Sequence, residues 1–135
     1  MPNLLLNIDV PALEPAIAFY TRALGLTLGR RFGDDAAELL GSDAPVYLLA
    51  KPAGSAIGPV PAATRSYDRH WTPIHPDFVV DDLDAAVARA LAAGAVQEGA
   101  TTDAPYGHIA MFADPFGHGF CLIQFNAKSY DALLD

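Results

Sequence analysis

Residues 74–95, IHPDFVVDDLDAAVARALAAGA, decide the fold, because a strand pattern leads directly into a helix pattern. One face of the expected strand carries the apolar residues Ile74, Phe78 and Val80. Apolar residues then recur at helical spacing. Asp82 has the side chain of an N-cap and Gly94 is a natural stop, so we expect the helix to lie between these two residues.

The same pattern occurs near the start of the chain, in LLLNIDVPALEPAIAFYTRALGL, residues 4–26. A shift of 70 residues superposes the apolar positions of the two stretches: Ile8 on Phe78, Val10 on Val80, Leu13 on Leu83 and Ile17 on Val87. This period is too long for a solenoid repeat. We therefore interpret the chain as two copies of one strand–helix unit, each followed by further strands.

The later strands are expected at roughly 28–32, 36–40 and 45–50 in the first copy and at 96–98, 108–113 and 119–125 in the second. Proline and small residues dominate the connection between the copies, and such long loops often line a ligand site. The predicted organisation is a single domain over residues 1–135, with a first module at about 4–50, a connection at about 51–73, a second module at about 74–126 and a tail at 127–135. The tail, NAKSYDALLD after residue 125, fits a short helix.

The composition fits a globular protein of one domain, with 135 residues, 52% hydrophobic and 18% charged. A formal net charge of −8 argues against nucleic acid or an anionic membrane as a partner. The single cysteine excludes an intrachain disulfide. The N-terminal residues lack the basic start of a signal peptide, and no apolar run is long enough to span a bilayer. These features predict a cytoplasmic protein.

The stretch ADPFGHGFCLIQF, residues 113–125, combines a turn with the last expected strand. Asp114 and Gly117 supply the turn geometry, which places His118 in the turn. Cys121 follows three residues later, and side chains alternate along a strand, so His118 and Cys121 point to opposite faces. We therefore interpret Cys121 as a small buried apolar residue, not as half of a catalytic dyad.

Two tandem β-α-β-β-β modules resemble the vicinal-oxygen-chelate superfamily, which includes glyoxalase I, extradiol dioxygenases, fosfomycin-resistance enzymes and bleomycin-binding proteins. AIAFYTRALGL resembles the first helix of these proteins, HPDFVVDDLDAA the opening strand of their second module, and ADPFGHGFCLIQF their closing turn and strand. The resemblance implies an α+β fold in which curved mixed sheets surround a cleft. It also implies a homodimer.

In metal-dependent members, the resemblance implies four His, Glu or Gln ligands from the first and last strand of each module, holding a divalent ion. These positions fall on Leu5, Tyr47, His75 and Cys121. Leu5 cannot bind a metal, Tyr47 is a poor ligand, and Cys121 replaces a carboxylate, so only His75 matches. No cofactor is therefore expected. A divalent metal held by His75 and Cys121 with added ligands, such as Asp77 or His108, is the alternative.

An apolar, aromatic-lined cleft is expected to bind a small organic molecule. The residues expected to line it are Leu5, Asn7, Tyr47, Trp71, His75, Asp77, His108 and Cys121. Asp77 shares a strand face with His75 and is placed to orient it, while Trp71 offers a ring for stacking. No nucleophile elbow and no phosphate-binding loop occurs in the sequence, so a serine triad and nucleotide use are not indicated.

Three functions follow from this reading. The first is a metal-independent protein of the glyoxalase and bleomycin-resistance type that binds a small organic ligand. The second is a metal-dependent lyase or dioxygenase of the same superfamily with an atypical ligand set. The third is a structural or regulatory dimer that binds no ligand. Whether the protein is an enzyme is left open by the residues alone.

Overall fold

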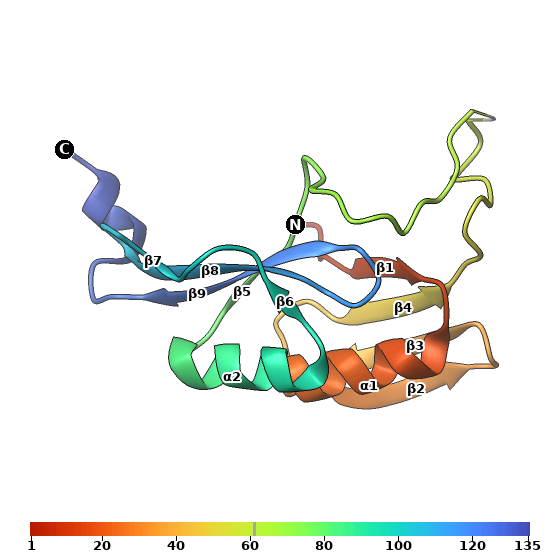
Figure 1. Ribbon diagram of the computed structural model, residues 1–135, viewed down its shortest axis with the longest axis horizontal. Coiled ribbons are helices and arrows are strands. Elements are labelled where there is room, and N and C mark those ends of the chain that lie inside the picture. Colours follow the sequence, from red (N-terminus) through yellow and green to blue (C-terminus); the bar gives the residue numbers. More distant parts are fainter. Residues whose placement is uncertain (61) are drawn as a thin grey trace. The chain divides into compact units, whose positions relative to one another are not determined.

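The computed structural model describes residues 1–60 and 62–135, and the chain divides into two compact units, Met1–Asp68 and Arg69–Asp135. Each unit combines one α-helix with one mixed β-sheet (Figure 1). The expected α+β fold with repeated strand–helix modules is confirmed. The division falls inside the connection predicted at 51–73, so that most of this segment belongs to the first unit.

The first unit contains β1 (Leu6–Val10), α1 (Leu13–Leu24), β2 (Thr27–Phe32), β3 (Ala36–Leu40) and β4 (Val46–Ala50). The strand order is β1-β4-β3-β2. Strand β1 pairs with β4 in parallel, and the other two pairings are antiparallel. A bulge interrupts the β2–β3 register between Leu28 and Arg31.

Alternation along the strands of the first unit separates a core face from an open face. The core face and the buried side of α1 contribute Val10, Ala16, Phe19, Leu39 and Leu48, none more than 2% exposed. The helix ends at Gly25, whose φ of 68° is the left-handed conformation that glycine adopts without strain. The open face of β1 presents Asn7, as the alternation predicts.

The second unit contains β5 (Asp77–Val79), α2 (Leu83–Ala93), β6 (Val96–Gln97), β7 (Thr102–Ala104), β8 (Gly107–Ala113), β9 (Gly119–Phe125) and the 3-10 helix η1 (Ser129–Leu133). The strand order is β5-β9-β8-β6, and β7 also pairs with β8. Strand β5 runs parallel to β9, as β1 does to β4. The two units therefore repeat one topology, with β7 as an addition that the sequence pattern does not predict.

The expected ends of α2 are confirmed. The Asp82 side chain accepts a hydrogen bond from the Ala85 amide, and Gly94 closes the helix with a φ of 113°. The expected strand before it is shorter than predicted, because β5 begins at Asp77 and Ile74 is 89% exposed. Pro76 has no amide hydrogen to donate to the ladder, which accounts for the late start.

The β8–β9 hairpin sets which side chains of the second unit face α2. Phe112 lies opposite Phe120, and their rings stack with centroids 5.4 Å apart. Gln124 lies on the same face of β9 as Phe120, and its side chain accepts a hydrogen bond from the first amide of α2, that of Leu83. Met111 and Cys121 form the neighbouring pair and therefore point away from α2.

The tail forms the short helix that was expected. In η1 the Tyr130 ring contacts Phe125 and Tyr106, with centroids 4.9 and 5.1 Å apart. Within residues 1–60 and 62–135, no helix combines the length and the apolar character that a membrane span requires.

Candidate functional site

Three of the predicted site residues meet on the face of the second sheet that is turned away from α2. Asp77 of β5 pairs in register with Cys121 of β9, and His75 lies just before β5. The His75 Nε2 atom is 3.3 Å from Asp77 Oδ1, and both side chains are 37% exposed. One donor atom from each of His75, Asp77 and Cys121 lies within 4.8 Å of the other two.

Cys121 is a buried thiol that holds its proton. Burial raises its pKa to about 12, and the charge of Asp77 and a hydrogen bond with its carboxylate act in the same direction. A thiolate is the reactive form of cysteine in nucleophilic attack and in metal binding. Cys121 is therefore poorly suited to either role at neutral pH.

Trp71 forms a wall beside this cluster. Its indole lies directly against Gly119, where a Cβ atom would be only 2.5 Å from Trp71 Cε3. Its ring meets that of His75 edge-on, with centroids 5.4 Å apart and planes at 83°. The glycine at position 119 is therefore needed for the close approach of the indole to β9.

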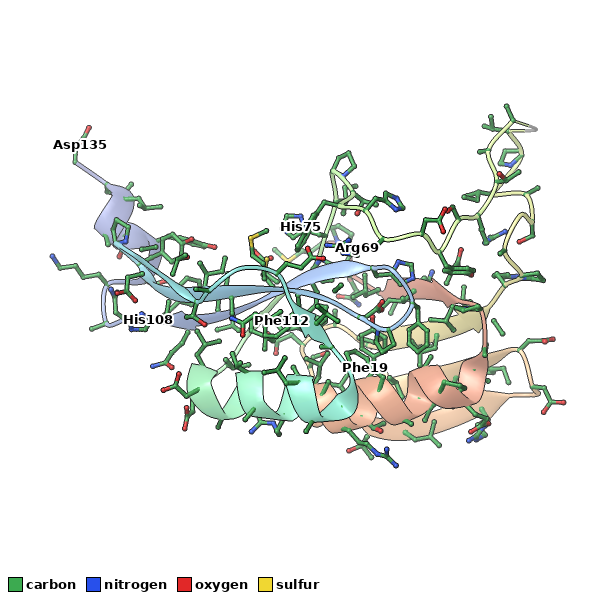
Figure 2. All side chains as sticks on the ribbon, viewed as in Figure 1. Phe19, Arg69, His75, His108, Phe112 and Asp135 are labelled. Carbon is green, nitrogen blue, oxygen red and sulfur yellow. The ribbon has the colours of Figure 1, made fainter. Side chains whose placement is uncertain are left out.

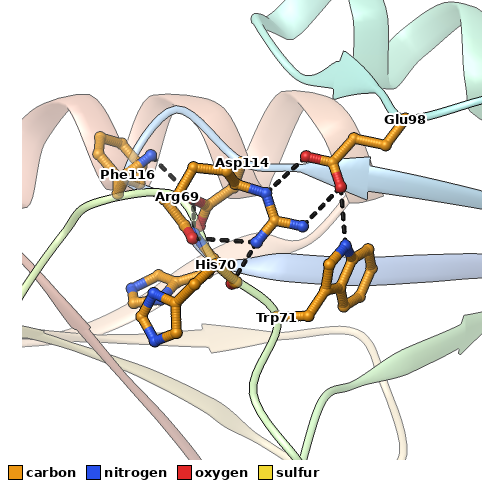
Figure 3. A network of polar contacts seen from close by, with 8 residues as sticks. Arg69, His70, Trp71, Glu98, Asp114 and Phe116 are labelled. Carbon is orange, nitrogen blue, oxygen red and sulfur yellow. Dashed lines mark hydrogen bonds and ion pairs between the residues drawn. The ribbon is translucent and has the colours of Figure 1, made fainter.

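Sequence reasoning missed Glu98, which fixes Trp71 in place. The carboxylate accepts a hydrogen bond of 2.8 Å from Trp71 Nε1 and two more from Arg69, at 2.6 and 2.7 Å (Figure 3). Arg69 also stacks on the Trp71 ring, 4.6 Å from its centroid. Glu98 lies beyond the short strand β6, where neither periodicity nor a motif distinguishes it from a surface carboxylate.

Arg69 and Asp114 tie this network to the turn before β9. Arg69 donates to the carbonyl oxygens of His70 and Gly117, and Asp114 accepts from the amides of Phe116 and His118. The turn geometry predicted around Asp114 is thus formed by a buried carboxylate.

His108 is not part of this cluster. It pairs with Gln124, so it lies on the face of the sheet toward α2, opposite to Cys121 (Figure 2). There its Nδ1 atom is 2.5 Å from Asp103 Oδ1, at a separate polar pocket of about 340 Å³. The strand phase of His108 was predicted, but the register between β8 and β9 was not.

The remaining predicted residues lie in the first unit. Leu5 precedes β1 and is exposed. Asn7 of β1 pairs in register with Tyr47 of β4, so these two side chains share the open face of that sheet. The next residue along this row is Glu38 of β3, which pairs with Tyr47.

Glu38 is a buried carboxylate that the sequence did not single out. Tyr47 donates its hydroxyl hydrogen to Glu38 Oε2 at 2.8 Å, and Arg30 binds both carboxylate oxygens, at 3.0 and 2.7 Å. Arg30 also stacks on the Phe32 ring. A lone carboxylate within the apolar strand AAELL, next to an arginine-bearing strand, is the signal that could have identified the pair.

The hydrogen bonds to Glu38 make the stability of the fold depend on pH in acid solution. Hydrogen bonds from Arg30, and then from Tyr47, lower the Glu38 pKa from 4.5 to about 2. The ionised Glu38 carboxylate therefore contributes its full share to the free energy of unfolding above pH 4.5. This contribution is lost as the pH falls toward 2 and the carboxylate is protonated. The urea concentration at the midpoint of unfolding should therefore fall more steeply with decreasing pH in the wild-type protein than in Glu38→Gln, over the range from pH 4.5 to 2.

Glu14→Gln provides the control for that measurement, because Glu14 pairs with Arg31 in a largely exposed position. The decrease of its urea midpoint at acid pH should stay close to that of wild type. If the urea midpoints of wild type and Glu38→Gln fall equally steeply with decreasing pH, Glu38 is not the source of the acid sensitivity.

The donors present do not fit the four-ligand divalent ion of metal-dependent relatives. At the positions carried over from the superfamily, Leu5 has no donor, and the Tyr47 hydroxyl is engaged with Glu38. His75 and Asp77 are suitable ligands, but Cys121 must first lose a proton that burial and Asp77 retain.

Comparisons with known proteins agree with this fold. The sequence model of the Glyoxalase-like domain family matches residues 6–123. A search of curated proteins returned no match. Among solved structures, a variant of the fosfomycin resistance protein FosX from Listeria monocytogenes, complexed with Mn(II) and 1S,2S-dihydroxypropylphosphonic acid, is similar, with a TM-score of 0.72 and 15% identity. The match covers 95% of this chain and 94% of that one.

Two further structures show the same fold. Lactoylglutathione lyase from Agrobacterium tumefaciens has a TM-score of 0.62 and 17% identity, over 91% of this chain and 94% of that one. A glyoxalase/bleomycin resistance protein/dioxygenase family enzyme from Burkholderia phytofirmans PsJN has a TM-score of 0.66 and 18% identity, over 90% and 96%. The chain therefore belongs to the Glyoxalase-like domain family, within the vicinal-oxygen-chelate superfamily.

Proposed function

We propose that this protein binds a small organic molecule, without a metal ion, on the face of the second sheet that carries Trp71, His75 and Asp77. The observation that carries the proposal is the combination of an accessible His75–Asp77 pair with an indole wall held beside it. The position where relatives are expected to carry a carboxylate ligand holds the protonated thiol of Cys121.

The proposed site suits a ligand with one planar apolar part and one polar edge. Trp71 is partly exposed and offers an aromatic surface, and Met111, 41% exposed on the same side of the sheet, offers a flexible apolar one. The Asp77 carboxylate accepts hydrogen bonds, so it favours a ligand that carries a hydroxyl or amine hydrogen. His75 supplies a second polar contact in either of its protonation states.

Leu5, Asn7 and Tyr47 belong to the first unit, and their contact with a ligand stays a prediction from the sequence. Support comes from the shared open face of Asn7 and Tyr47 and from the Phe32 ring, 6.3 Å from that of Tyr47. We leave His108 out of the site because it lies on the opposite face of its sheet from Cys121. A cytoplasmic homodimer remains the predicted form of the protein.

The sole tryptophan makes the proposal directly testable by intrinsic fluorescence. We expect saturable quenching of Trp71 emission by at least one member of a panel of planar phenols and amines that includes catechol and bleomycin. His75→Ala and Asp77→Asn should each weaken that binding about tenfold, the value of one lost charge-assisted hydrogen bond.

His108→Ala is the matched control, because it removes an imidazole from the other face of the same sheet. Its affinity should stay within about twofold of wild type, since the contacts at the proposed site are unchanged. The absence of quenching by every compound would contradict the proposal, and so would an equal loss of affinity in all three variants.

A metal-dependent lyase or dioxygenase is the second candidate function, and the donor cluster of His75, Asp77 and Cys121 favours it. It predicts one tightly held divalent ion per chain in elemental analysis, lost in His75→Ala. It also predicts turnover of methylglyoxal–thiol adducts or catechols on addition of divalent metals. A metal-bearing protein of this kind would replace the metal-free proposal. A structural or regulatory dimer without ligand, the third function, is contradicted by any saturable binding at Trp71.

A further inference from the structure

His75 depends on few contacts for its orientation. It precedes β5, and the bonding to β9 begins one residue later, where the Pro76 carbonyl oxygen accepts a hydrogen bond from the Cys121 amide at 3.1 Å. Its imidazole meets the ring of Trp71 edge-on and lies within ion-pair distance of the Asp77 carboxylate. The orientation of the imidazole therefore depends on where Trp71 is held.

Trp71 itself lies in the connection and not in a strand, yet it is held from three sides. Gly119 lets the indole approach β9, Arg69 stacks on its ring, and Glu98 binds its Nε1–H. The backbone of Glu98 is anchored in turn, because its amide donates to the Met111 carbonyl oxygen at 2.8 Å. Glu98 thus connects a residue outside the strands to the rigid β8–β9 hairpin.

We propose that Glu98 is a positioning residue, which clamps Trp71 through Arg69 and the indole N–H and thereby aims the His75 imidazole at Asp77. The inference rests on the proposed function, in which His75 and Asp77 contact the ligand. The Glu98 carboxylate acts on the ligand only through Trp71 and His75, and its own oxygens are used by Arg69 and Trp71.

The electrostatics of the clamp support this role. Hydrogen bonds from Arg69 are the largest cause of a lowered Glu98 pKa, so the carboxylate stays ionised in neutral solution. An ionised acceptor holds an N–H group about twice as strongly as a neutral one. A neutral side chain at position 98 should therefore loosen the indole even when it keeps the same shape.

The test uses ligand-free protein and two probes already in the chain. The single indole N–H gives one NMR signal, and its hydrogen exchange reports the bond to Glu98. The nuclear Overhauser effect between the Trp71 and His75 rings reports the orientation of the imidazole. In Glu98→Ala we expect indole exchange to rise about tenfold and the ring–ring effect to fall by more than half. Glu98→Gln, which keeps one acceptor and the shape of the side chain, should give an intermediate result.

Glu14→Gln is the matched control, because Glu14 forms a two-point ion pair with Arg31 in the first unit. It should change neither signal. Gly119→Ala provides an independent variant that leaves Glu98 intact but displaces the indole, and it should also abolish the ring–ring effect. A Glu98→Gln protein with faster indole exchange and an unchanged ring–ring effect would overturn the inference.

These outcomes are separate from those of the proposed function. Loss of the ring–ring effect in the Glu98 variants supports positioning whether or not any compound binds. If His75→Ala lowers the affinity for a quenching phenol but Glu98→Ala leaves both that affinity and the ring–ring effect unchanged, the binding site stands and the clamp is refuted. Since the Trp71 N–H and ring signals are measured without ligand, failure of the panel cannot be mistaken for failure of the clamp.

Discussion

Cys121 is expected to react with iodoacetamide about a thousand times more slowly at neutral pH than an unhindered cysteine. Burial and the adjacent Asp77 raise its pKa from 9.0 to about 12, which lowers the thiolate fraction by that factor. Because the sulfur is buried, iodoacetamide also has poor access to it, which slows the reaction further. Mass spectrometry of the intact chain over time measures the rate directly, because the protein has no other cysteine.

Asp77→Asn tests the electrostatic part of this expectation. Removal of the carboxylate charge should lower the Cys121 pKa and accelerate alkylation about tenfold, the effect of one pKa unit. Thermal unfolding of the variant checks that the thiol has not been exposed by loss of structure. Rapid alkylation of the folded wild-type protein would show that Cys121 is a thiolate, and it would favour the metal-dependent alternative.

Phe112→Ala is expected to lower the free energy of unfolding by about 3–5 kcal/mol, the usual loss for a fully buried phenylalanine. Phe112 is completely buried on the α2 face of the second sheet, and its ring stacks on Phe120. Truncation leaves a cavity between the sheet and α2 that the surrounding backbone cannot fill. Urea unfolding monitored by circular dichroism measures the change.

Met111→Ala is the matched control for this substitution. Met111 is the adjacent residue on the same strand, but it points to the other face and is partly exposed. We expect a loss below about 1 kcal/mol there. Comparable losses at both positions would mean that the alternation along β8 has been assigned to the wrong faces.

Much of the fold could be predicted because the chain repeats itself. A strand and a helix with the same apolar spacing occur twice, and the helix ends at Asp82, Gly25 and Gly94 depend on interactions with residues nearby in the sequence. Strands β3 and β9 have the predicted limits. Strand β7 was missed because its three residues, TDA, show no apolar alternation and are held only by pairing with β8.

The candidate site was predictable only where side chains lie close in sequence. His75 and Asp77 are two residues apart, just before β5 and at its first residue, so their position on one face follows from the alternation of an extended chain. The position of His108 depends on the register between two strands, which no single strand encodes. Glu98 and Glu38 acquire their roles from arginines 29 and 8 residues away, and tertiary structure alone brings these groups together.

One difference between the two copies bears on how such a protein changes over generations. In the first copy, the Leu6 amide donates to the Pro45 carbonyl oxygen and lengthens the ladder at the start of β1. The equivalent position in the second copy is Pro76, which has no hydrogen to donate. The bonding to β9 begins at the Pro76 carbonyl oxygen, which accepts a hydrogen bond from the Cys121 amide at 3.1 Å. Residues 72–75 precede that bond and can change without breaking it. The second copy therefore has an opening segment, residues 72–75, in which substitutions can alter ligand preference while the sheet stays intact.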